Sequence, residues 1–163
     1  MNIPTKEECL KILRDSNVPD NIIAHTSAVC DFSMKIVDFL ESKGINVNRE
    51  LVCAAALLHD VKKLSKNDHV IEGYEFVKSL GYPEVATVIK KHGLAHIEND
   101  EFFPKTVEEK IVFYADKRVQ NDKIVSMEER FTYIKKRYNR PEVDKEKEIA
   151  KEIEEELLEG IKI

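Results

Sequence analysis

The sequence predicts an all-α protein folded as a single domain, and three observations support this. The 163 residues can bury a sizeable core, since 42% of them are hydrophobic. Glycine and proline number only five each, and the charged residues, 35% of the chain, mix both signs. No strand-like alternation of useful length appears, and no stretch rich in serine, glycine and proline separates two parts. We therefore expect residues 1–163 to form one helical bundle.

Capping signals and hydrophobic spacing place the first three helices at residues 6–15, 20–43 and 49–61. Thr5 stands three residues before a glutamate, which is the pattern of a capping box, and Gly44 follows the end of the second helix. The third helix contains the apolar run of residues 51–58. A helix that is apolar on every side has to be buried.

The remaining helices are expected at residues 69–80, 83–92, 107–120, 127–138 and 142–159. Gly81 and Gly160 end the first and last of them, and Thr106 and Ser126 open two others as capping boxes. The longest irregular segment, 93–105, has a length that is often functional. The last helix has only a narrow apolar stripe, so we expect it to pack across the domain edge or against a second subunit as a homodimer.

Charge and hydropathy exclude several classes of function. The net charge is -5, and the acidic tail from Glu146 to Glu159 disfavours binding to long nucleic acid. No window approaches 18 uninterrupted apolar residues, and the N-terminus lacks the pattern of a signal peptide, so we expect a soluble, cytoplasmic protein without a membrane partner. The odd, widely spaced Cys9, Cys30 and Cys53 predict neither a disulfide framework nor a zinc ribbon.

The pair His59-Asp60 ends the apolar run of residues 51–58. A buried helix that ends in this way delivers an imidazole and a carboxylate into the protein interior, where neither is stable without a partner. A metal ion is the simplest such partner. A hydrogen-bonded pair at a helix end is the plain alternative, so the rest of the sequence has to decide between them.

Further metal-ligand residue types fall on core-facing positions. His25 lies within the apolar stripe of its helix, His92 follows the stripe of residues 85–89, and Asp116 stands four residues after Val112. Buried aspartates are rare without a cation or strong donors nearby. One metal centre accounts for a whole set of residues at once: His25, His59, Asp60, His92 and Asp116. His69, at the start of a helix, and His96, in the irregular segment, can face either the site or solvent.

In their order and approximate spacing, His25, His59-Asp60 and Asp116 resemble the H…HD…D signature of the HD superfamily of metal-dependent phosphohydrolases. The resemblance covers roughly residues 20–120 and implies an HD-type helical bundle, with residues 121–163 as a C-terminal helical extension. The extra histidines His69 and His92 look most like those of the bacterial symmetrical dinucleoside tetraphosphate hydrolases. The chain departs from the family pattern at Ile22, where a basic residue is frequent, and at Lys62, where a glycine is frequent.

The resemblance implies two metal ions with Asp60 bridging them. One ion would be held by His25, His59, Asp60 and Asp116, and the other by His69 and His92. Nitrogen and carboxylate ligands suit Fe, Mn, Zn, Co or Ni better than Ca or Mg. If His69 and His92 lay more than ~8 Å apart, they could not share an ion.

A phosphate substrate also needs positive charge, and cations are frequent near the ligand positions: Lys62, Lys63, Lys66, Lys90, Lys91, Lys117 and Arg118. Lys63 matches the lysine of the family's HDxxK pattern, so the resemblance assigns catalytic roles to Asp60 and Lys63. Lys63 and Arg118 are the candidates for binding substrate.

The expected function is hydrolysis of a small phosphorylated metabolite, most simply a nucleotide, by attack of metal-activated water on phosphorus. Two alternatives stay open. The fold can serve as a non-catalytic nucleotide-binding module, and di-iron oxygenases carry a similar ligand set.

Overall fold

The computed structural model describes residues 1–163 and is all-α apart from one small hairpin. Its helices are α1 (Lys6–Asp15), α2 (Asp20–Ser42), α3 (Arg49–Leu58), α4 (His69–Ser79), α5 (Pro83–Lys90), the short 3-10 helix η1 (Asp100–Phe102), α6 (Val107–Asp116), α7 (Met127–Tyr138) and α8 (Val143–Leu158). The strands β1 (Val119–Gln120) and β2 (Lys123–Ile124) pair antiparallel. The predicted fold class is confirmed.

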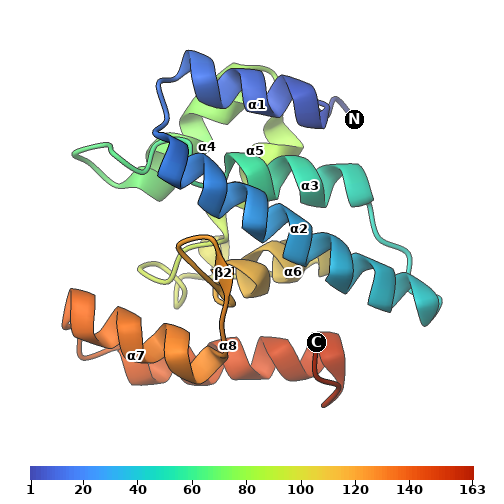
Figure 1. Ribbon diagram of the computed structural model, residues 1–163, viewed down its shortest axis with the longest axis vertical. Coiled ribbons are helices and arrows are strands. Elements are labelled where there is room, and N and C mark those ends of the chain that lie inside the picture. Colours follow the sequence, from blue (N-terminus) through green and yellow to red (C-terminus); the bar gives the residue numbers. More distant parts are fainter.

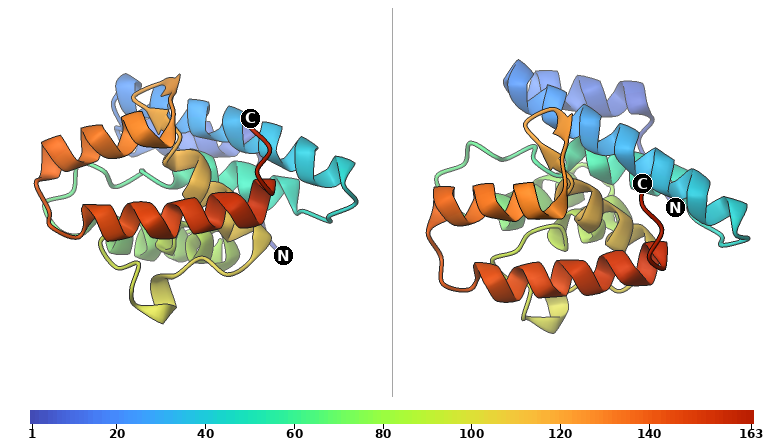
Figure 2. Two further views of the ribbon diagram at one scale, coloured as in Figure 1. Left: turned by 90° about the horizontal axis from the view of Figure 1, so that it is seen from below. Right: turned by 60° about the horizontal axis from the view of Figure 1, so that its bottom comes forward.

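The helices stack in layers around α6. Helices α2 and α3 pack side by side across the upper half of Figure 1, with α1 above α3 and with α4 and α5 paired behind them. The last two helices, α7 and α8, form a separate layer at the bottom of Figure 1, and both views of Figure 2 show that they run antiparallel. Helix α6 packs against α2 and α3 on one side and α8 on the other. It therefore lies at the centre of the molecule.

Burial follows the hydrophobic pattern of the sequence. The apolar run of α3 is buried along nearly its whole length, as a helix without a polar face requires. All residues of α6 from Ile111 to Asp116 are buried too, and one hydrophobic cluster continues from α1 to α8. None of the helices is both long and apolar enough to span a membrane.

The predicted helix 107–120 is too long. Helix α6 ends at Asp116, and the chain then forms the β1–β2 hairpin, although the sequence analysis expected no strand. Asn121 in the turn has a φ of 57°, in the left-handed region that asparagine enters more readily than most residues. Two-residue strands are too short to give a periodic signal, which explains why the sequence analysis missed them.

Candidate metal centre

The six predicted ligands come from five helices and lie mostly where those helices begin or end. His59 caps the C-terminus of α3 and Asp60 follows it. His69 is the first residue of α4, His92 lies two residues beyond α5, and Asp116 is the last residue of α6. Only His25 lies inside a helix, in α2. The predicted helices 49–61 and 83–92 therefore overshoot, since α3 and α5 end just before their ligands.

One group of donors gathers around Asp116. The Oδ1 atom of Asp116 lies 3.1 Å from Nε2 of His25 and 3.3 Å from Nε2 of His59. The Oδ2 atom of Asp60 lies 3.6 and 3.4 Å from the same two nitrogens. Two imidazole nitrogens and two carboxylate oxygens thus face one point, which is a donor set for a transition metal.

A second group faces the other oxygen of Asp60. Its Oδ1 atom lies 3.7 Å from Nε2 of His92 and 3.8 Å from Nε2 of His69. The rings of His69 and His92 are 6.1 Å apart between centroids. The donor atoms that lie within 4.8 Å of one another on this side of the centre belong to His59, Asp60 and His92, so His69 stands further out. Asp60 therefore presents one oxygen to each group.

The histidines are oriented by hydrogen bonds on the opposite side of their rings. In each ring Nδ1 donates to a backbone carbonyl oxygen. His25 bonds to Asn121 at 2.6 Å. His59 bonds to Ala56 at 2.7 Å, and His92 bonds to Ile89 at 2.6 Å. These bonds occupy Nδ1, so Nε2 is the atom that carries the lone pair whenever the ring is neutral. Such bonds between a ligand histidine and a backbone carbonyl are typical of metal sites.

The Nε2 atom of His59 is the best test of whether a metal fits. It is fully buried and has no hydrogen-bond partner among the described residues, although two carboxylates lie nearby. A buried polar nitrogen left without a partner is expensive. A divalent ion between these residues would satisfy it, so the residues present fit a metal.

The two carboxylates govern the charge of the centre. Burial opposes the ionisation of both carboxylates, but their neighbours outweigh it. The pKa of Asp60 is held well below its usual range by His59 and His92. The pKa of Asp116 is held equally low by Lys117, His25 and His59. Burial equally opposes the charged form of His59, yet the carboxylates raise its pKa to about 10. An ion entering this group must therefore displace a proton.

Near the centre lies a small hollow of about 40 Å³, bounded by Asp60, Lys63, Ile22 and the turn between α1 and α2. It has room for about three water molecules. Lys63 thus lies where the sequence predicts, beside Asp60, and its ammonium is also one of the charges that lower the pKa of His69 to about 4, after burial and His92.

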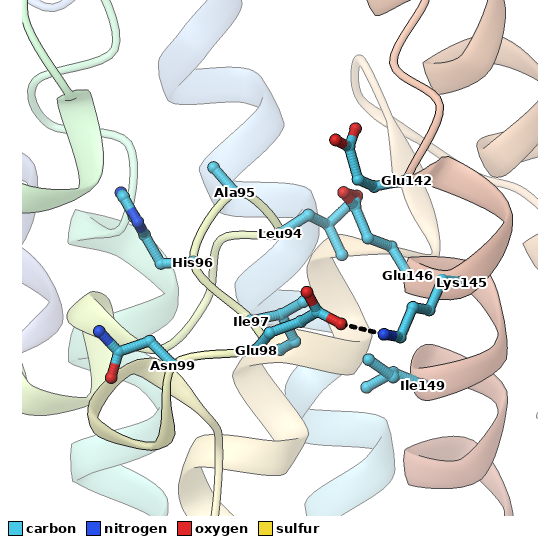
Figure 3. A pocket seen from close by; sticks show the side chains of 10 residues that line it. All are labelled: Leu94, Ala95, His96, Ile97, Glu98, Asn99, Glu142, Lys145, Glu146 and Ile149. Atoms are coloured by element: carbon cyan, nitrogen blue, oxygen red, sulfur yellow. Dashed lines mark ion pairs between the residues drawn. The ribbon is translucent and has the colours of Figure 1, made fainter.

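A larger cavity of about 200 Å³ lies elsewhere, between the segment 94–99 and α8 (Figure 3). None of the six predicted ligands lines it. Two of its lining residues, Glu98 and Lys145, form an ion pair, which is the dashed line in Figure 3. His96 lines this cavity and bonds through Nε2 to Asp68 at 2.6 Å, so it supports the start of α4 rather than the donor groups.

Arg118 is placed differently from the other predicted site residues. Its guanidinium donates to the carbonyl oxygens of Val125 (2.6 Å) and Ile163 (3.0 Å) and to the hydroxyl of Tyr114 (2.6 Å). All three nitrogens are engaged within the fold. The structure supports a role in fastening the hairpin and the C-terminus, and substrate binding by Arg118 stays an untested prediction.

Two contributors to the centre escaped the sequence analysis. Asn121 acts through its backbone carbonyl, which leaves no trace in the side-chain pattern. Lys117 was counted among the surrounding cations, but it is buried and donates from Nζ to Asp116 Oδ2. Lys117 directly follows the core-facing Asp116, and this position was the signal in the sequence that could have indicated its burial.

Comparison with known proteins identifies a family. The family model described as "HD domain" matches residues 22–121. A tRNA (cytidine(56)-2'-O)-methyltransferase of Picrophilus torridus is 34% identical over 140 residues, which are 78% of this chain and 40% of that protein. An uncharacterized protein of Methanocaldococcus jannaschii is 29% identical over 144 residues, 80% of this chain and 85% of that protein.

A third relative carries a hydrolytic activity in its name. The dihydroneopterin 2',3'-cyclic phosphate phosphodiesterase of Methanocaldococcus jannaschii is 30% identical over 113 residues, 58% of this chain and 44% of that protein. The chain therefore spans less than half the length of the methyltransferase and of the phosphodiesterase. No solved structure matches the chain significantly.

Proposed function

The chain belongs to the HD domain family, and from this membership and its donor groups we propose that it is a metal-dependent phosphohydrolase acting on a small phosphorylated metabolite. The observation that carries the proposal is the division of Asp60 between two sets of histidine nitrogens. A bridging carboxylate is what two neighbouring ions require. The family match over residues 22–121 also supports an HD-type core at about 20–120 with a helical extension at 121–163.

Each residue has a distinct part in the proposed reaction. His25, His59, Asp60 and Asp116 would hold one ion, and His69 and His92 together with Asp60 would hold the other. Divalent ions bound there would supply Lewis acidity and would lower the pKa of bound water, which is the chemistry that hydrolysis at phosphorus requires. Fe, Mn, Zn, Co and Ni all suit these donors.

Lys63 is the proposed contact for the phosphate. It lines the hollow beside Asp60, and it is an exposed residue. The hollow is of a size for a phosphoryl group, so the rest of a substrate would extend over the α1–α2 turn. A nucleotide is the substrate class that we propose first.

A cyclic phosphodiester is a second candidate, because one relative is named a cyclic phosphate phosphodiesterase. We do not extend the methyltransferase activity to this chain, since it matches only 40% of that protein.

The test is hydrolysis by the purified protein after chelation and reloading with Mn²⁺, Fe²⁺, Co²⁺, Ni²⁺ or Zn²⁺. The panel includes nucleoside monophosphates, dinucleoside tetraphosphates and nucleoside 2',3'-cyclic phosphates, with products followed by chromatography. We expect metal-dependent turnover that Asp60→Asn abolishes and that Glu98→Gln, at the larger cavity, leaves unchanged. Nucleotide binding without product would contradict hydrolysis and favour a binding module, and oxygen uptake by the iron form without phosphate release would favour an oxygenase.

A further inference from the structure

Lys117 is the most deeply buried lysine or arginine of the protein, with 3% of its surface exposed. It directly follows Asp116 at the end of α6, where its backbone N–H closes the helix onto Phe113 and Tyr114. Its side chain turns inward with the ammonium 4.8 Å from the centre of the Phe113 ring. A buried ammonium is unfavourable unless it is hydrogen-bonded and paired.

Both acceptors of Lys117 belong to the metal centre. Nζ donates to Oδ2 of Asp116 at 2.6 Å and to the carbonyl oxygen of His92 at 2.8 Å. Asp116 belongs to the first donor group, and His92 belongs to the second. One side chain therefore links a ligand of each group.

The hydrogen bond from Lys117 gives the two carboxylate oxygens of Asp116 different partners. Oδ1 faces His25 and His59, whereas Oδ2 is occupied by the ammonium. Oδ1 is therefore the oxygen of Asp116 that is left facing the first group. Asp60 differs, because no lysine engages it and each of its oxygens faces a separate pair of histidines.

We propose that Lys117 is a positioning residue that favours coordination of the first ion by a single oxygen of Asp116 and that fixes the segment after α5, in which His92 lies. This rests on the proposed function only in that the centre binds metal. Partners of ligands that lie beyond the coordination sphere typically change metal affinity 10–100-fold when they are removed. Without Lys117, Asp116 is released to bind through both oxygens, and the coordination number of the first ion rises.

The experiment loads Co²⁺ into wild type, Lys117→Met, Lys117→Arg and a control, Lys110→Met. Lys110 lies on the same helix and pairs with Glu156 of α8, away from the donor groups. Visible absorption of bound Co²⁺ reports coordination number, and competition with a chelator reports affinity. Circular dichroism checks folding, and if Lys117→Met does not fold, Lys117→Gln replaces it with the same expectation.

We expect Lys117→Met to bind Co²⁺ about tenfold more weakly or worse and to show the weaker absorption of a higher coordination number. Lys117→Arg keeps a cation and is expected to lie closer to wild type, and Lys110→Met to match wild type. A folded Lys117→Met protein with the wild-type spectrum and affinity overturns the proposal, as does an equal effect in Lys110→Met. Co²⁺ binding by wild type without any hydrolysis overturns the hydrolase alone, whereas no Co²⁺ binding overturns both.

Discussion

The two ends of α6 each bury a carboxylate, but in opposite electrostatic settings. At the N-terminal end, Glu109 accepts hydrogen bonds from the backbone N–H groups of Lys105 at 2.7 Å and Thr106 at 3.0 Å, and from Nζ of Lys91 at 3.1 Å. The helix dipole favours an anion there. At the C-terminal end, where the dipole disfavours an anion, Asp116 faces His25 and His59.

This difference separates a carboxylate that stabilises the fold from one that we assign to function. Glu109 completes a capping box and is satisfied by the protein alone. Asp116 gathers nitrogens whose lone pairs point at one place, and one of them, Nε2 of His59, has no hydrogen-bond partner. Burial by itself does not distinguish the two carboxylates, since 5% of Glu109 and 6% of Asp116 are exposed. Their hydrogen-bond and charge partners distinguish them.

The largest expected effect comes from Asp116→Asn. The substitution removes an anionic ligand of the first ion, so several kcal/mol of the transition-state stabilisation that the metal would provide are lost. We expect kcat/KM to fall on the order of 1000-fold, at about 1.4 kcal/mol for each factor of ten. Steady-state assays at saturating metal measure this, and wild-type activity in the variant would remove Asp116 from the centre.

Glu109→Gln is expected to leave activity unchanged and to reduce stability. Loss of hydrogen bonds to a charged acceptor reduces the free energy of unfolding by about 1.5–3 kcal/mol at neutral pH. Urea denaturation of the metal-free proteins measures it. Glu98→Gln, which breaks only a surface ion pair, should change the free energy by less than about 1 kcal/mol.

The effect of Glu109→Gln should also depend on pH. Burial opposes ionisation of Glu109, but the backbone N–H groups and Lys91 hold its pKa below the usual 4.5. The stabilisation is therefore complete above pH 4.5 and is lost as the pH falls through the folded-state pKa. Equal destabilisation of the variant at acidic and neutral pH would contradict this account.

A smaller effect is expected from Gly93→Ala, next to His92. A Cβ atom at Gly93 would lie 2.9 Å from a methyl group of Val70, which follows His69 at the start of α4. The clash costs about 1–3 kcal/mol and shifts α4 against α5, so the second ion should bind more weakly than the first. Metal titration checks this. In the control Gly73→Ala, the new Cβ meets Ile89 at an ordinary 3.6 Å, and unchanged binding is expected.

Much of the fold could be predicted from local signals. The capping boxes at Thr5 and Thr106 are present as predicted, because a capping box depends only on residues three positions apart. The ends of α3, α5 and α6 were predicted two to four residues too late. His59, His92 and Asp116 occupy core-facing positions and are buried, and the sequence analysis extended each helix through them because burial alone does not show where a helix ends.

The sequence analysis predicted which side chains gather at the centre, but not the groups that hold them in place. His25, His59, Asp60, His69, His92 and Asp116 lie together in the structure, although their roles as ligands stay predictions. The carbonyl of Asn121 and the buried ammonium of Lys117 depend on tertiary structure. Arg118 was chosen for its charge, and its hydrogen bonds to Tyr114, Val125 and Ile163 require contacts that no local pattern encodes.

The most direct test of the two-ion centre is the metal-to-protein ratio of wild type, His69→Ala and His25→Ala, measured by elemental analysis after metal loading and dialysis. We predict two ions per chain in wild type and one in His69→Ala, whose remaining ion stays with His25, His59 and Asp116. In His25→Ala the ion of that first group should be lost or weakened. A wild-type protein without bound metal, or the same ratio in wild type and His69→Ala, would contradict the account.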